Sequence, residues 1–152
     1  MAEASDTYEK NLWLLEGKRN FCIYQKQKFS AFLWENEHTL LIQKPAKEQK
    51  TEFVRLHLDT LCTTPAFTIP ANVVQLERIS VQHYAYLAEE SVQKQNDDDT
   101  IVLTQIPFWD NGVGYISGKR NHLYVYYEES QTSKALFAGN WHVENLSVSN
   151  TQ

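Results

Sequence analysis

Short runs of aromatic and aliphatic residues, separated by turn-forming residues, recur along most of the chain and constrain its fold more than any other feature. In the first half these runs are Phe21–Gln25, Phe29–Trp34, His38–Gln43 and Glu52–Leu58. In the last of them Val54, Leu56 and Leu58 alternate with polar residues. Because successive side chains of a strand point to opposite faces, this alternation indicates a strand with one buried and one wet side. The sequence therefore predicts antiparallel β-sheet.

The same pattern returns in the second half of the chain. The expected strands there are Thr100–Ile106, Gly112–Ser117, His122–Glu128, Lys134–Ala138 and Trp141–Val148. Gly139-Asn140 is a two-residue turn signal that would join the last two strands as a hairpin. Both sides of that hairpin carry apolar side chains, so we expect it to be covered on both sides or curled into a barrel.

Two stretches favour helix instead. Near the N-terminus, Tyr8, Leu12 and Leu15 recur at helical spacing, and Gly17 can supply the left-handed conformation that ends a helix. In the middle of the chain, most apolar residues fall on one half of a helical wheel, which predicts a helix over Ser80–Gln93.

The residues just before that helix carry weaker signals. The β-branched start of the middle segment leaves residues 72–79 open between strand and helix. The stretch Thr60–Ala71 contains Pro65 and Pro70, and we expect it to be irregular because proline removes a ladder donor.

The expected fold is therefore α+β. Residues 1–152 would form a single domain with a mostly antiparallel sheet of about eight or nine strands, a short N-terminal helix and one longer central helix. Residues 1–5 and 149–152 would be frayed ends. A closed β-barrel with a packed helix is the alternative.

Charge and composition exclude several classes of protein. Residues 59–152 carry five basic and eleven acidic side chains, and this acidic excess disfavours nucleic-acid binding. No run approaches the roughly 20 apolar residues of a membrane span. The two cysteines, Cys22 and Cys62, match no metal or redox motif, and the N-terminus lacks the features of a secretory signal. We therefore expect a cytoplasmic protein that binds neither nucleic acid nor membrane.

Catalytic motifs are missing from the sequence. It has no nucleophile elbow, no phosphate-binding loop and no dinucleotide fingerprint. His57 with Asp59 and His142 with Glu144 could each place two ligands on one strand face, but no third ligand follows from the sequence. We predict no cofactor, no metal site and no catalytic residue, which favours a non-catalytic role without excluding an enzyme.

Aromatic residues near the C-terminus carry the strongest functional signal. The predicted partner-binding or ligand-binding residues are Trp109, Tyr115, Tyr124, Tyr126 and Trp141. Tyr124 and Tyr126 alternate with Leu123 and Val125, so they are exposed if the aliphatic side faces the core. Core filling by the same rings is the other interpretation.

The leading hypothesis is a non-catalytic cytosolic protein–protein interaction module, such as an adaptor, an inhibitor or a chaperone-like subunit. Its binding surface would be the aromatic, acidic C-terminal β surface, because Tyr and Trp are enriched at interfaces. A protein partner is expected, and a homo-oligomer stays open. The alternatives are a carrier or sensor of a small apolar ligand with an aromatic pocket, and a small hydrolase or metal-dependent enzyme.

Overall fold

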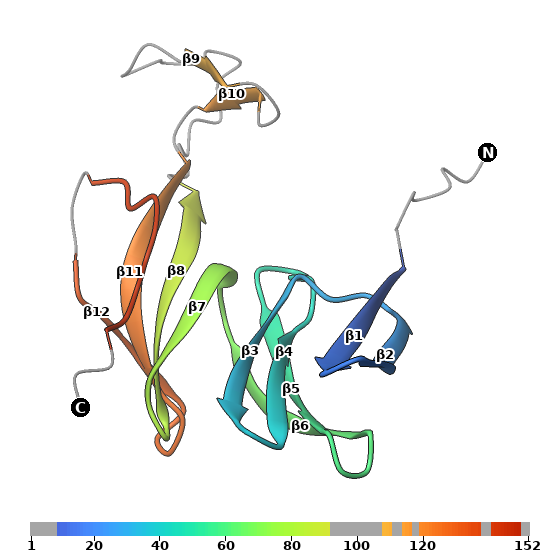
Figure 1. The fold of residues 1–152 in the computed structure, drawn as a ribbon. Helices are drawn as coiled ribbons and strands as arrows, with labels where there is room; N and C mark the ends of the chain where they lie inside the picture. Colours follow the sequence, from blue (N-terminus) through green and yellow to red (C-terminus); the bar gives the residue numbers. More distant parts are fainter. Residues whose placement is uncertain (1–8, 92–107, 111–113, 117–118, 138–140, 150–152) are drawn as a thin grey trace.

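The fold consists of β-strands, as a computed structural model shows (Figure 1). The structure describes residues 9–91, 108–110, 114–116, 119–137 and 141–149. Its strands are β1 (Lys10–Glu16), β2 (Arg19–Gln27), β3 (Ala31–Asn36), β4 (Thr39–Gln43), β5 (Thr51–His57), β6 (Cys62–Ile69), β7 (Asn72–Ser80), β8 (His83–Ser91), β9 (Phe108–Asp110), β10 (Gly114–Ile116), β11 (Lys119–Tyr127) and β12 (Thr132–Ala135). No helix occurs in these ranges, and so they hold none that could cross a membrane.

The strands form antiparallel sheets of neighbours in sequence. The "central sheet" has the order β3-β4-β5-β6, and the "last sheet" has the order β12-β11-β8-β7. Strands β1 and β2 form a separate two-stranded sheet, the "first hairpin", and β9 pairs with β10. The sheets are not closed into a barrel. Both fold expectations, α+β and a closed barrel with a packed helix, are therefore wrong.

Two apolar cores hold the sheets face to face, one on each side of the central sheet. The first core joins the first hairpin to β4 and β5, and the second joins the central sheet to the last sheet. All five residues of β4 are buried, because neighbours in the strand alternate between the two cores. The central sheet is thus covered on both faces over β4.

The expected N-terminal helix is a strand. Residues Lys10–Glu16 form β1, and Gly17 begins the tight turn into β2 with a φ of 60°. The glycine takes the left-handed conformation that the sequence indicated, but in a hairpin turn. Helical spacing misled here because β1 carries apolar residues on both faces: Leu12 packs in the core while Trp13 is exposed.

The expected central helix is also wrong. Residues Asn72–Ser80 and His83–Ser91 form the hairpin β7–β8, with a turn at Val81 and Gln82, whereas residues 92 and 93 lie outside the described part. Residues 84–88 are buried without a break, since β8 has a covered surface on each face. A continuous apolar run of this kind has no period, so it fits a buried strand as well as a helix.

The stretch expected to be irregular contains an ordered strand. Residues Cys62–Ile69 form β6, with Pro65 opposite Val54 and a register irregularity between Phe53 and Val54. The strand tolerates a proline because β6 is an edge of the central sheet, where a missing donor breaks no ladder on the outer side. The four strands predicted earlier in the chain are confirmed as β2 to β5 with small shifts of their bounds.

The C-terminal strand predictions are only partly confirmed. The predictions over 122–128 and 134–138 correspond to β11 and β12, and 114–116 of the predicted 112–117 forms β10. The prediction over 100–106 and the turn at 139–140 lie outside the described residues. The predicted strand Trp141–Val148 is wrong, because no residue of 141–149 is in a strand.

Residues 141–149, the "C-terminal segment", are attached to the last sheet at two strands. The amide of Val143 donates to the carbonyl of Asn121 in β11 (2.9 Å). The side chain of Gln75 in β7 donates to the carbonyl of Leu146 (2.6 Å) and accepts from its amide (3.1 Å). The Gln75 side chain thus replaces a peptide group, so the segment is bound without joining the sheet as a strand.

Candidate functional site

The five aromatic residues predicted to form a binding surface are not brought together as one exposed patch. Tyr126 is buried, with 1% of its surface exposed, and Tyr124 is partly buried, whereas Trp141 is 70% exposed. Trp109 and Tyr115 pair with each other across β9 and β10, and their side chains lie outside the described part. The expectation that Tyr126 is exposed is therefore wrong.

Four tyrosines of the last sheet face the central sheet, namely Tyr84, Tyr86, Tyr124 and Tyr126. Tyr126 lies opposite Tyr84 in the sheet, and its ring packs against Phe67 of β6 with the centroids 4.7 Å apart. On the other face of β11, Val125 is also buried. The prediction assumed one buried and one wet side, but both faces of this strand are buried here.

Tyr124 takes part in a small polar cluster near one end of the last sheet. Its hydroxyl donates to the carboxylate of Glu90, which also pairs with Nδ1 of His122 at 3.0 Å. The ring of Tyr124 stacks on that of Tyr86, with 5.1 Å between centroids. Burial raises the pKa of Tyr124 above its ordinary range, and the bond to Glu90 raises it further. The hydroxyl is therefore a donor that stabilises Glu90.

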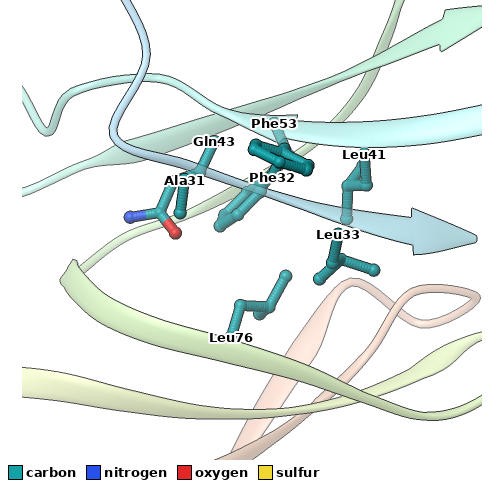
Figure 2. Close-up of a pocket in the computed structure, with 7 residues that line it drawn as sticks. All are labelled: Ala31, Phe32, Leu33, Leu41, Gln43, Phe53 and Leu76. Atoms are coloured by element: carbon teal, nitrogen blue, oxygen red, sulfur yellow. The ribbon is translucent and has the colours of Figure 1, made fainter. Parts of the chain in front are cut away.

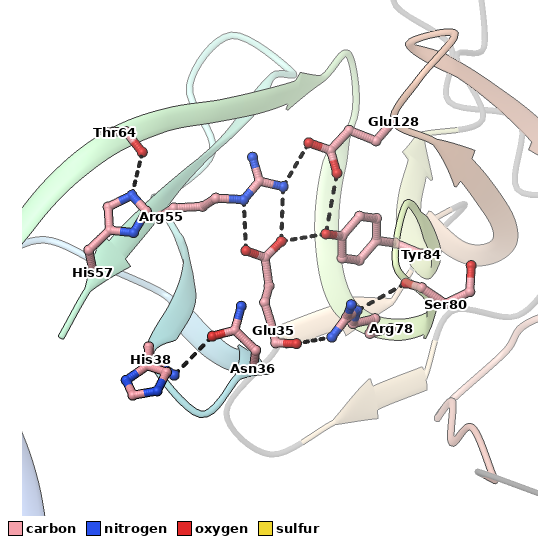
Figure 3. A network of polar contacts seen from close by, with 10 residues as sticks. All are labelled: Glu35, Asn36, His38, Arg55, His57, Thr64, Arg78, Ser80, Tyr84 and Glu128. Atoms are coloured by element: carbon pink, nitrogen blue, oxygen red, sulfur yellow. Dashed lines mark hydrogen bonds and ion pairs between the residues drawn. The ribbon is translucent and has the colours of Figure 1, made fainter. Parts of the chain in front are cut away.

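The densest polar chemistry lies between the two large sheets (Figure 3). We call it the "inter-sheet network", and it consists of Glu35, Arg55, Arg78, Tyr84 and Glu128. Arg55 binds both oxygens of Glu35, at 2.7 and 3.0 Å, and one oxygen of Glu128 at 2.7 Å. Tyr84 donates to Glu35 at 2.5 Å, and Arg78 donates to the main-chain carbonyl of Glu35.

Each of the two sheets contributes charges to this network. Glu35 and Arg55 lie on β3 and β5, whereas Tyr84 lies on β8 and Glu128 follows β11. The hydrogen bond to Glu35 raises the pKa of Arg55 above its ordinary value, and burial raises that of Tyr84, helped by its bond to Glu35. The guanidinium thus stays charged and the phenol stays protonated. The network joins the two sheets through hydrogen bonds and ion pairs.

The histidine–carboxylate pairs that could have held a metal are not assembled. His57 contacts Thr64 (3.0 Å), and Asp59 pairs with His38 (3.3 Å) rather than with His57. His142 accepts from the main-chain amide of Asn121 at 3.2 Å. Across the part of the chain that the structure describes, no group of three His, Cys, Asp or Glu residues could hold an ion.

The hollow between the two large sheets is small (Figure 2). Its volume is about 20 Å³, and Phe53, Leu76 and Gln43 are among the residues that line it. A space of this size holds about one water molecule. Gln43 uses its amide to donate to the carbonyl of Val73 at 2.8 Å, across the junction of the sheets. The hollow is a packing gap and is much smaller than a ligand pocket, which typically measures several hundred Å³.

Two large exposed aromatic side chains lie along β3. Phe32 and Trp34 are 47% and 48% exposed, and β3 is an edge of the central sheet. Trp34 also lines an open groove of about 510 Å³ together with the exposed residues Ile79 and Val81 at the β7–β8 turn. We call the two exposed rings of β3, Phe32 and Trp34, the "β3 surface".

The sequence interpretation missed both the β3 surface and the inter-sheet network. Phe32 and Trp34 belong to a run that was correctly predicted as a strand, but nothing in the sequence says that β3 is an edge. The network joins residues 20 to 73 positions apart, as Arg55 does with Glu35 and Glu128. The one signal in the sequence that could have indicated an ion pair is a glutamate, Glu35, directly after a strongly apolar run. Glutamate is rarely buried unless it is paired, and Glu35 is buried in the structure.

Comparisons with known proteins give a fold likeness and no family. No protein-family model matches the sequence, and no curated protein matches it. The fold is similar to that of a Pyrococcus horikoshii acylaminoacyl peptidase in its orthorhombic crystal form, with a TM-score of 0.52 and 17% identity over 84% of this chain and 21% of that chain.

Two further peptidase structures are similar to a lesser degree. The uncomplexed Pyrococcus horikoshii acylaminoacyl peptidase gives a TM-score of 0.48 and 15% identity, over 82% of this chain and 20% of that chain. An acylaminoacyl peptidase in complex with Z-Gly-Gly-Phe-chloromethyl ketone gives a TM-score of 0.43 and 16% identity, over 69% of this chain and 18% of that chain. The chain thus spans about a fifth of the length of the peptidases that it is similar to, and at this identity the likeness concerns the fold alone.

Proposed function

We propose that the chain is a non-catalytic protein–protein interaction module that binds its partner through the β3 surface. The observation that carries this proposal is the half exposure of two large aromatic rings, Phe32 and Trp34, on an edge strand beside an open groove. Large exposed apolar patches mark interaction sites, and aromatic residues are typical anchors of such sites.

The exposed rings of the β3 surface give an estimate of what covering them would contribute to binding. An aromatic side chain presents roughly 150–250 Å² of surface. Covering the exposed halves of the Phe32 and Trp34 rings would remove roughly 200 Å² of apolar surface from water, which is worth about 5 kcal/mol before the costs of association. The groove beside them offers Arg78 and Glu77 as polar contacts at its rim. The earlier idea of a C-terminal tyrosine surface gives way to this one, because Tyr126 belongs to the core.

The proposal includes a cytosolic location. Cys22 and Cys62 are both free thiols, and Cys62 is exposed. A free, exposed thiol fits a reducing compartment better than an oxidising one.

The binding proposal is tested by capture with matched variants. The tagged chain, the double variant Phe32→Ser/Trp34→Ser and the control Leu61→Asn are exposed to a lysate of the source cell, and bound proteins are quantified by mass spectrometry. Leu61 is 53% exposed in the turn before β6, and its positive φ of 53° suits asparagine. We expect a protein that the wild type and the control retain and the double variant loses. Equal recovery on all three chains would refute the proposed surface.

A second candidate function comes from the structural comparison. We propose, as the alternative, that the chain is an all-β part of a larger peptidase, because its fold is similar to about a fifth of an acylaminoacyl peptidase. Stacked four-stranded antiparallel sheets are also the repeating units of β-propellers, and the central and last sheets have that form.

This candidate is tested by hydrolysis of an N-acetylated amino-acid 4-nitroanilide. We expect no turnover by the purified chain and measurable turnover by the complex that it captures. A captured complex that is inactive on acylated substrates would exclude this candidate and leave the first one standing.

A further inference from the structure

The first hairpin covers only part of the central sheet. Its contacts on that face involve β4 and β5, through residues such as Leu40, Ile42 and Leu56, which are at most 1% exposed. Phe32 lies opposite Ile42, and Trp34 lies opposite Leu40, so both rings point to this same face. Their exposure of nearly one half shows that the cover stops between β4 and β3.

The number of strands explains why the cover stops there. The central and last sheets have four strands each, whereas the first hairpin has two. Strands lie about 4.8 Å apart, so a two-stranded sheet spans roughly half the width of a four-stranded one. Among the described residues, no strand pairs with either outer edge of the hairpin. One more hairpin beside it would extend the cover across β3.

The β6 edge of the same face of the central sheet does not need such a cover. On this face, β6 presents Thr63 opposite Leu56 and Pro65 opposite Val54. Water solvates the threonine hydroxyl well, whereas exposing the rings of Phe32 and Trp34 to water raises the free energy of the fold. The apolar strip that remains uncovered is therefore on the β3 side.

We propose that a partner protein supplies an acidic, antiparallel β-hairpin that lies beside the first hairpin, pairs with the outer edge of that hairpin nearer to β3, and covers Phe32 and Trp34. This inference rests on the proposed function and names the partner's chemistry. The partner's hairpin would extend packing that this chain already has, since Phe29 of the hairpin core is in edge contact with Phe32, at 6.5 Å between ring centroids.

The positive charge of the first hairpin favours a partner hairpin with negative charge. Residues 9–28 carry five basic and two acidic side chains, a net charge of +3, in a chain whose overall net charge is −5. Lys18 and Arg19 lie exposed at its turn. A hairpin with acidic residues on its solvent side would be attracted to this end of the molecule, whereas a basic one would be repelled.

The test uses a defined probe, a phage library of disulfide-closed hairpins of about 14 residues with randomised strand positions. The library is selected on the full-length chain alone, and the affinities of the winners are then measured for the wild type, for Phe32→Ser/Trp34→Ser and for the matched control Leu61→Asn. Trp34→Gln serves as a second, milder variant, and circular dichroism checks the fold of each chain. Hydrogen exchange with the winning peptide then locates the strand that it pairs with.

We expect winners with one apolar face and an acidic other face, which bind the double variant at least roughly tenfold more weakly than the wild type or the control. Main-chain amides of the first hairpin gain protection from exchange. The inference is overturned if selected hairpins bind the double variant equally well, if basic ones dominate, or if protection appears on the β3 edge instead. If native-partner capture still depends on Phe32 and Trp34 in such a case, the proposed function survives and only the hairpin inference fails.

Discussion

Replacing Arg55 with leucine would leave two carboxylates at the junction of the large sheets without their shared cation. The guanidinium makes three hydrogen bonds, to Glu35 and Glu128, and Glu35 is only 9% exposed. Removing one partner of a buried ion pair costs about 3–5 kcal/mol. Because the Arg55 side chain is 24% exposed, we expect the lower end, about 3 kcal/mol of unfolding free energy.

Urea unfolding followed by tryptophan emission measures this loss. With a slope of about 2 kcal/mol per molar urea, the midpoint would fall by about 1.5 M. Arg19→Leu is the matched control, since Arg19 is exposed in the first hairpin, and its effect should stay within about 0.5 kcal/mol. The double variant Arg55→Leu/Glu35→Gln removes the more buried of the two stranded charges, and the amide oxygen of the introduced glutamine can still accept from Tyr84. We expect it to be more stable than Arg55→Leu by about 1 kcal/mol or more.

Two results would show that the reasoning is wrong. A loss of less than about 1 kcal/mol in Arg55→Leu would mean that water screens the network as it screens a surface pair. Strict additivity of the two substitutions would mean that Glu35 and Arg55 do not interact energetically, whatever their distance.

Three further predictions concern other parts of the fold. Tyr126→Ala should cost about 3–5 kcal/mol in urea unfolding, because it opens a cavity in the core, whereas Tyr124→Ala should cost less. The unfolding free energy should fall as the pH rises above about 10, because the unfolded chain then loses phenolic protons that the folded chain retains. Tyr84→Phe should reduce the dependence of the unfolding free energy on pH by up to about 1.4 kcal/mol per pH unit. An unchanged dependence in alkaline melts would contradict this prediction. Gly17→Ala should lower the unfolding free energy by about 1 kcal/mol through its positive φ alone, as no atom lies within 4 Å of the added methyl group, and an unaffected thermal midpoint would argue against that turn.

The correctly predicted strands have one of two features. Either one face is buried and the other is exposed, or turn-forming residues flank the strand. β5 is the best example, because Val54 and Leu56 face the hairpin core and alternate with Arg55. The hairpin β7–β8 was missed for two physical reasons. Its turn, Val81-Gln82, has none of the residues that favour tight turns, and β8 is buried on both faces.

The candidate site was harder to predict than the strands. Alternation correctly placed Tyr124 and Tyr126 opposite Leu123 and Val125, but it could not say that Val125 is buried as well. Which strand forms an edge depends on the order of strands in a sheet, and that order is a long-range property. For this reason nothing in the sequence marked Phe32 and Trp34 as surface residues, although they are half exposed in the structure.

Because of Pro65, further strands can pair with only one edge of the central sheet in a regular ladder. At the β6 edge it removes one donor, and the neighbouring register irregularity bends the strand, so a further chain cannot extend the sheet there in a regular ladder. The opposite edge, β3, contains no proline and carries two exposed aromatic rings. At high concentration, fibre-like addition of strands would therefore begin at β3 and stop at β6. A lysine or proline placed on β3 would protect a concentrated sample against precipitation, whereas the same change on β6 would add little.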